Sequence, residues 1–302
     1  MNSDSNAATI EYDNFIGAYH SSLVRTNEGV YKVWGEDVAN NGTSDHLTPV
    51  VLDSTNYPNL TGTVLKAHLG SNGYQNVQGI VLTTSGLFAW SSEGYVLHNN
   101  LTSSSTLQAV TIGGNSQGLP TGVTPADVKM IFTTYQTMAL VTCAGDVYVI
   151  TQNSEMAGIG LSGSISTTNA TQWHRVTTSA TGNPYLSNVL AVRGNQHTLF
   201  ALKDDGTLWT WGEETFLGNN TNQTTRTRAT QMVAPTANAI KMIGVTRNDN
   251  NGRVSYYVLN ADGNLYALGE NGKRQMGDWT TSDRLSWVQP RYNSSSGQVM
   301  ND

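Results

Sequence analysis

Short apolar runs separated by turn-forming residues recur along the whole chain, most clearly from Leu199 to Gly218. This stretch reads LFALKDDGTLWTWGEETFLG, an apolar run, an acidic turn and an alternating aromatic run. Asp-Gly turns favour hairpins because glycine adopts a positive φ without steric cost. The β-branched and aromatic residues after the turn suit a pleated, packed strand. We therefore expect a β-hairpin here, with Gly212 ending the second strand where another backbone comes close.

The same hairpin is repeated at an almost constant interval. Turn glycines follow one another after 57 residues (29 to 86), 59 (86 to 145), 61 (145 to 206) and 57 (206 to 263). An apolar run precedes each hairpin, such as Val189–Val192, and a short run containing Pro or Val follows it, such as Thr230–Val233. The repeated unit is therefore four short strands, and no run has the pattern of a three-turn amphipathic helix.

A four-stranded antiparallel unit repeated at this period predicts an all-β protein, a β-propeller built of about five blades. One blade cannot bury both of its faces, so neighbouring blades must share a core. We expect Trp34, Trp90 and Trp211 to fill the space between blades. The chain is expected to form a single domain over 1–302, with repeats at roughly 10–63, 64–125, 126–185, 186–236 and 237–292, and with 293–302 starting a further strand or closing the propeller.

The fourth unit resembles the repeat of the regulator of chromosome condensation family. The resemblance rests on Gly194-Asn195-Gln196-His197-Thr198, on Ala201 to Gly212 and on Leu217-Gly218, and parts of the first and fifth units match it too. The second and third units are degenerate, and the third lacks the Trp-Gly pair. The resemblance implies a seven-bladed propeller, for which this chain is too short. We therefore expect a portion of such a propeller, with closure by five blades as the alternative.

Members of that family include a nucleotide exchange factor for a small GTPase, bound to chromatin, and bacterial protein-binding propellers such as a secreted β-lactamase inhibitor. Composition argues against the chromatin-bound role, because charged residues make up 13% of the chain and its net charge is −6. An acidic, lysine-poor chain is a poor ligand for nucleic acid or an anionic membrane surface. No apolar run approaches the length of a membrane helix, and the single cysteine, Cys143, permits no internal disulfide.

Candidate catalytic and metal-binding patterns are weak throughout the chain. The six histidines have no zinc-type spacing, and Asp204, Asp205 and Asp262 fall on hairpin turns. Asp249 to Gly252 superficially suggests a calcium loop but lacks its terminal glutamate. No nucleophile elbow, phosphate loop or dinucleotide fingerprint is present. We expect no enzyme activity, no cofactor and no metal site.

The loops at one face of a propeller are the expected binding surface. Equivalent connections would bring several side chains to that face, and the candidate binding residues are Tyr19, His20, Tyr74, Tyr135, Gln196, His197 and Arg247. Three inserts are alternative contact sites: Asp53 to Thr63, Gly113 to Ala126 and Ser162 to Thr171.

The sequence favours a non-catalytic, protein-binding propeller. Its low charge and its content of Asn, Thr and Ser are typical of a bacterial secreted or cell-surface module, for example an adhesin. The partner is expected to be another protein. A carbohydrate-binding, lectin-like propeller is the first alternative, with glycan as its ligand. An exchange-type regulator and an enzyme built on the propeller scaffold are the remaining ones.

Overall fold

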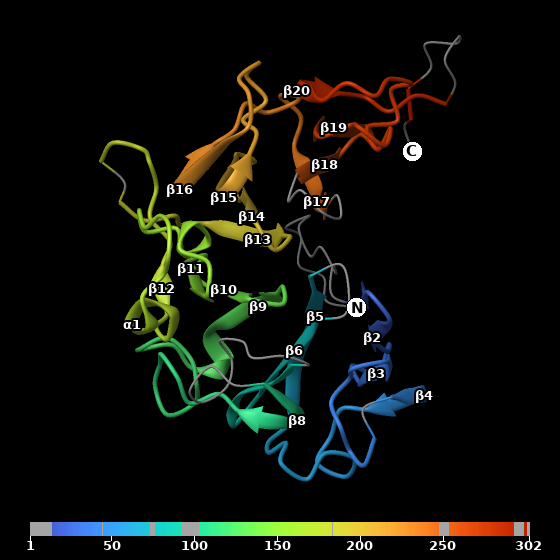
Figure 1. Cartoon of the computed structure of the whole chain (residues 1–302), viewed down its shortest axis with the longest axis vertical. Helices are drawn as coiled ribbons and strands as arrows, with labels where there is room; N and C mark the ends of the chain where they lie inside the picture. The colour runs from blue at the N-terminus through green and yellow to red at the C-terminus, as the bar shows by residue number, and fades with distance from the viewer. Residues whose placement is uncertain are drawn as a thin grey trace.

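The computed structural model describes residues 14–43, 45–72, 76–91, 103–182, 184–247, 254–292 and 299–300. Within them the chain forms five four-stranded antiparallel sheets, each with its strands in chain order. The five sheets follow one another around a common centre (Figure 1). The predicted all-β propeller of four-stranded blades is therefore confirmed. Whether these five blades belong to a seven-bladed ring stays a prediction.

Each sheet is one blade, and its first strand lies nearest the centre. The strands of blades 1 and 2 are β1 (Phe15–Ala18), β2 (Ser21–Arg25), β3 (Tyr31–Gly35), β4 (His46–Val51), β5 (Val64–Ser71), β6 (Val77–Thr83), β7 (Gly86–Ser91) and β8 (Ser104–Ala109). Those of blade 3 are β9 (Val128–Thr133), β10 (Thr137–Thr142), β11 (Val147–Thr151) and β12 (His174–Arg175). Those of blades 4 and 5 are β13 (Val189–Gly194), β14 (Thr198–Lys203), β15 (Leu208–Thr215), β16 (Thr224–Gln231), β17 (Ile240–Arg247), β18 (Val254–Asn260), β19 (Leu265–Gly269) and β20 (Arg284–Val288).

Helical structure among the described residues is limited to single turns in the connections. These turns are η2 (Pro125–Asp127), η3 (Glu155–Ala157) and α1 (Thr167–Ala170). No helix in the described part of the chain has the length and apolarity needed to cross a bilayer.

The predicted turn at Asp204-Asp205-Gly206 is confirmed. Gly206 has a φ of +79°, and Asp205 accepts the backbone N–H of Thr207 at 2.9 Å. The second hairpin differs from the prediction, because its turn is Thr84-Ser85 alone and Gly86 is already the first residue of β7, opposite Thr83. A two-residue turn replaces the longer one there, so Gly86 is not equivalent to the other turn glycines.

The core lies between blades, as predicted, and tryptophans on the third strands are central to it. Trp90 and Trp211 are fully buried. Each donates its indole N–H to the preceding blade, Trp90 to the carbonyl of Asp37 at 3.2 Å and Trp211 to that of Met156 at 2.9 Å. Each tryptophan thus combines a large buried apolar surface with a satisfied polar group.

Trp34 does not belong to this core, contrary to the prediction. It occupies the equivalent position in blade 1, but its side chain is only half buried, and its nearest aromatic neighbour is the exposed Phe15, 6.5 Å away between ring centroids. The adjacent Val33 faces blade 2, so alternation along β3 directs Trp34 away from blade 2. No described blade precedes blade 1 and covers it.

The outer strands are the least accurately predicted elements. The fourth strand of blade 4 is expected at Thr230–Val233 but spans Thr224–Gln231. These strands are largely polar and exposed, so their pairing is not marked by an apolar run. At the C-terminal end, Val299 forms an isolated antiparallel bridge with Arg291.

Because Trp211 is buried and Trp34 is half exposed, truncation to alanine should reduce stability by different amounts at the two positions. Trp211→Ala should lower the free energy of unfolding by about 3–5 kcal/mol, because it empties a buried site and leaves the Met156 carbonyl unbonded. Trp34→Ala should cost less than half as much, because that side chain is half exposed and bonds no described acceptor. Urea unfolding of both variants measures the difference, and equal losses would contradict the assignment of Trp34 to an uncovered face.

Candidate binding face

The connections between the first and second strands of all blades reach the same face of the propeller, because every sheet has the same strand order. In blades 1, 3 and 4 these connections are Tyr19–His20, Thr134–Gln136 and Asn195–His197. The ends of the third strands lie beside them, since Gly35 pairs with Ser21 and Gly212 with Thr198. We call these connections, together with Glu36 and Glu213, the candidate face.

The sequence-predicted binding residues that the structure describes lie in these connections, except Arg247. Tyr19 is 44% exposed and stacks on His20 with ring centroids 3.8 Å apart. Tyr135 and Gln196 are half buried, and Arg247 is the last residue of β17. Tyr74 and the calcium-like stretch at 249–252 lie outside the described residues. The structure thus pairs Tyr19 with His20 in blade 1 and Gln196 with His197 in blade 4, and a role in binding stays a prediction for each.

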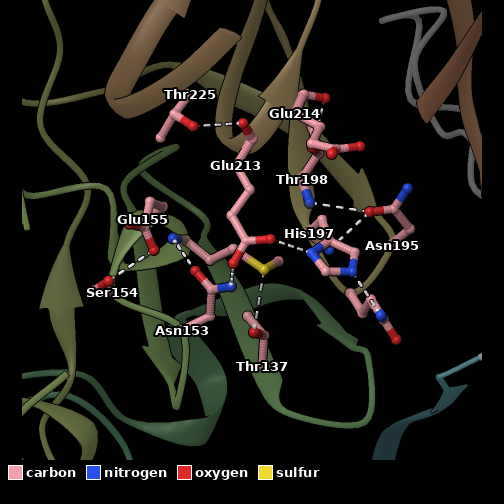
Figure 2. A network of polar contacts seen from close by, with 12 residues as sticks. Thr137, Asn153, Ser154, Glu155, Asn195, His197, Thr198, Glu213, Glu214 and Thr225 are labelled. Carbon is pink, nitrogen blue, oxygen red and sulfur yellow. Dashed lines mark hydrogen bonds and ion pairs between the residues drawn. The ribbon is translucent and has the colours of Figure 1, made fainter. Parts of the chain in front are cut away.

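His197 belongs to a polar network that joins blades 3 and 4 (Figure 2). Its Nδ1 bonds to one carboxylate oxygen of Glu213, and its Nε2 lies 2.6 Å from the amide nitrogen of Gln196. The other carboxylate oxygen accepts an amide hydrogen of Asn153, from blade 3, at 2.5 Å. Because a carboxylate can only accept, Nδ1 carries a hydrogen and donates it to Glu213. Both ring nitrogens are therefore held by protein groups.

The backbone brings the histidine and the glutamate together. A Cβ on Gly212 would lie 2.1 Å from the carbonyl oxygen of His197, and Gly212 has a φ of +127°. Only glycine fits this close approach. The expected contact with another backbone is thus confirmed, but β15 does not end at Gly212. It continues to Thr215 after a shift in register.

Blade 1 repeats the arrangement in a more exposed form. A Cβ on Gly35 would lie 2.0 Å from the carbonyl oxygen of His20, and His20 Nδ1 lies 2.6 Å from Glu36 Oε2. The side chains of this pair are 50% and 62% exposed. Sequence reasoning recognised the two histidines as equivalent but missed both glutamates. The available signal was that each glutamate directly follows a Trp-Gly pair.

The electrostatic state of the face follows from these contacts. The hydrogen bond from His197 lowers the pKa of Glu213, and that from Asn153 adds to the effect, while burial opposes it. Burial raises the pKa of Asp37, and the negative charges of Asp45 and Glu36 raise it further. Glu213 therefore stays ionised to a lower pH than an ordinary glutamate. The loop after β3, in contrast, concentrates the negative charges of Glu36, Asp37 and Asp45.

The centre of the propeller contains a cavity of about 500 Å³ at the ends of the inner strands. All five inner strands contribute to its wall. The described residues that line it are Phe15, Ile16, Gly17, His68, Leu69, Gly70, Ser71, Phe132, Thr133, Thr134, Arg193, Gly194, Asn195, Gln196 and Val245. Because Gln196 and Thr134 also belong to the candidate face, the cavity opens within it.

The polar side chains of this face are largely bonded to one another. Within the described part of the chain, no three His, Cys, Asp or Glu side chains are grouped so that they could hold a metal ion. Both imidazole nitrogens of His197 are engaged by protein groups, and so are both oxygens of Glu213. This pair is therefore arranged to orient the connection rather than to exchange a proton with a substrate.

The fold defines the protein as a β-propeller, and comparison with solved structures defines the repeat as RCC1-like. The chain is similar to human WBSCR16, with a TM-score of 0.63 and 15% identity over 90% of this chain and 64% of that one. It is similar to Prp20p of Saccharomyces cerevisiae, with a TM-score of 0.66 and 12% identity over 93% of this chain and 63% of that one. For yeast RCC1 (Prp20) bound to Kap60, the TM-score is 0.58 and the identity 12%, over 90% of this chain and 59% of that one.

These similarities are structural. The chain spans less than two thirds of the length of these solved proteins. No family model matches the sequence, and no curated protein does. The predicted resemblance to the RCC1 repeat is therefore confirmed as a fold.

The Glu213 contacts predict a pH dependence of stability. The pKa of Glu213 is lower in the folded chain than its ordinary value of 4.5, so between these two values the unfolded state binds more protons. Stability should therefore decrease as the pH falls below 4.5 toward the folded-state pKa. Urea midpoints measured across this range should show less acid sensitivity in Glu213→Gln than in the wild type.

Glu36→Gln is the matched control, because it removes the same group from the exposed His20–Glu36 pair. Exposed ion pairs contribute little to stability, so this variant should retain the wild-type profile. An unchanged profile in Glu213→Gln would contradict the role assigned to the network.

Proposed function

We propose that this chain is a non-catalytic, protein-binding propeller and that its partner docks on the candidate face. The observation that carries the proposal is the presentation of exposed aromatic and polar side chains on connections fixed by hydrogen bonds between blades. Tyr19 exemplifies it, because its ring is 44% exposed yet stacked on His20, and its backbone N–H reaches Ser71 of blade 2 at 3.4 Å. A side chain that is ordered before binding loses little entropy on docking.

The similar solved structures support a protein partner. Prp20p is described with its binding properties to Gsp1p and histones, and yeast RCC1 (Prp20) is seen bound to Kap60. We do not carry those partners over to this chain, because identities of 12% relate the folds alone. What carries over to the proposal is the use of an RCC1-like propeller as a platform for another protein.

Composition supports two finer parts of the proposal. The net charge of −6 argues for a protein partner and against nucleic acid. The low content of charged residues, 13%, supports placing the protein outside a bacterial cell or on its surface, where adhesion is a suitable role. Fractionation of the source cells with an antibody tests this location, and recovery of the protein only from the cytosol would contradict it.

The docking face can be tested with two tyrosines of similar exposure. Tyr19 lies on the candidate face, whereas Tyr185, 41% exposed, lies in the connection between β12 and β13 on the opposite face. A partner captured from the source organism should bind Tyr19→Ala about tenfold more weakly than wild type, because exposed, ordered tyrosines are typical hot spots. Tyr185→Ala should bind within about twofold of the wild type.

Biolayer interferometry with the purified partner gives both dissociation constants. If only Tyr185→Ala weakens partner binding, the interface lies on the opposite face and not on the candidate face. A glycan array run on the same proteins covers the lectin-like alternative, and binding to a glycan without any protein partner would refute the proposal.

A further inference from the structure

A second pocket lies at the outer edge of the junction between blades 1 and 2, and we call it the rim pocket. Its walls come from three segments: the connection between β3 and β4, the insert Asp53 to Thr63, and β8. β4 and β8 are the outer strands of their blades (Figure 1). The rim pocket has a volume of about 310 Å³ and shares no described lining residue with the central cavity.

Asn40 presents an amide donor to the rim pocket, which it lines. Its backbone N–H donates to the carbonyl of Ser105 on β8 at 2.7 Å, so the residue is fixed against blade 2. Its side-chain Oδ1 accepts the backbone N–H of Gly42 at 2.6 Å. This second bond orients the amide and leaves the hydrogens of Nδ2 without an acceptor among the described residues.

Asn59 presents the complementary acceptor on the opposite wall. Its Nδ2 donates to the carbonyl of Leu107 on β8 at 3.3 Å, and this bond connects the insert to blade 2. Its Oδ1 accepts no hydrogen bond from the described part of the chain. Asn41 also lines the pocket, is exposed, and adds a third amide that no described group engages. The rim pocket therefore combines unused donors with unused acceptors, and two of the three amides are held from behind by β8.

The wall of the rim pocket is uncharged. Tyr57 is the sole ionisable side chain among its described lining residues, and burial, followed by the negative charge of Asp53, raises the pKa of its hydroxyl. The hydroxyl is therefore neutral at physiological pH. Pro58, which is exposed, and Leu107, which is buried, supply apolar surface. Because Asp53 lies close enough to act on Tyr57, its charge disfavours an anionic ligand.

We propose that the rim pocket binds a neutral saccharide, with Asn40 donating to one hydroxyl and Asn59 accepting from the adjacent one. Each sugar hydroxyl both donates and accepts a hydrogen bond, so neighbouring hydroxyls match amides that offer one group of each kind. The C–H face of the ring packs on Pro58. A volume of about 310 Å³ is at the lower end of the usual range for small-molecule sites and suits one hexose unit.

This inference does not depend on the proposed function, because the rim pocket is built from other residues than those proposed to dock a protein. A free sugar and the terminal hexose of a glycan have the same chemistry at this pocket. The experiment therefore includes both sources.

The test uses the intact chain and follows its side-chain amide resonances in ¹⁵N–¹H NMR titrations. The probes are the methyl pyranosides of glucose, galactose and mannose, and a glycan array covers the attached form. At least one glycoside should shift the Nδ2 hydrogens of Asn40 and reach saturation, or a neutral glycan of the array should be bound. Absence of both results would overturn the inference.

Three control probes separate a saccharide from other ligands. Tetrahydropyran-2-methanol has the ring without the adjacent hydroxyls, capped triglycine offers peptide groups, and methyl glucuronide carries a negative charge. Each should bind at least about tenfold more weakly than the best neutral glycoside, because each leaves amide groups unpaired or adds charge repulsion. Equal binding by any of the three would overturn the assignment of a neutral saccharide.

Two asparagine variants locate the site. Asn40→Asp keeps an oxygen for the bond to Gly42 but replaces the free amide donor, so saccharide binding should weaken at least about tenfold. Asn219→Asp is the matched control, because Asn219 forms the same turn on an exposed loop of blade 4, where its Oδ1 accepts the N–H of Thr221 at 3.2 Å. This control should bind within about twofold of the wild type.

Unchanged binding by Asn40→Asp, or equal losses in both variants, would overturn the inference. If circular dichroism shows that Asn40→Asp does not fold, the probes applied to the wild type decide the matter alone. Partner binding that depends on Tyr19 without any saccharide binding would remove the rim-pocket site and leave the docking face. Saccharide binding that is lost in Asn40→Asp would keep the site even where no protein docks.

Discussion

The packing of each third strand against the preceding blade is the interaction on which the structure depends. Trp90 and Trp211 bury their rings completely and donate their indole hydrogens to carbonyls about 55 residues earlier in the chain. A blade that lacked this contact would expose an apolar face to water. Because the hydrogen bond needs one orientation of the indole, it also fixes the position of one blade on the next.

The same few residues connect this core to the candidate face. Immediately after Trp211, the backbone turns so closely past His197 that only a glycine fits, and the next residue, Glu213, bonds the histidine it has just passed. Core packing, the close approach and the polar pair are therefore consecutive along the chain. Blade 1 has the same order, and there an exposed pair results because no described blade covers Trp34.

The sequence carried the information for hairpins and for the blade, because alternation and turn residues are local signals. It predicted the burial of Trp90 and Trp211 and the tight passage at Gly212. It failed for Trp34, since burial there depends on a neighbouring blade rather than on β3 itself. It also missed the early start of β16, a polar strand whose partner, β15, supplies the pairing.

The cavity lay beyond sequence reasoning for a further physical reason. His68, Phe132 and Arg193 are about 60 residues apart in the chain and belong to units whose similarity to one another is weak, so no motif joins them. Only strand register shows that they share one position of the repeat. A position that points toward the centre is not needed for blade packing in the way that Trp211 is. Its side chains can therefore differ from blade to blade, and the different side chains of Ile16, His68, Phe132 and Arg193 give the cavity a chemistry that a regular repeat would not have.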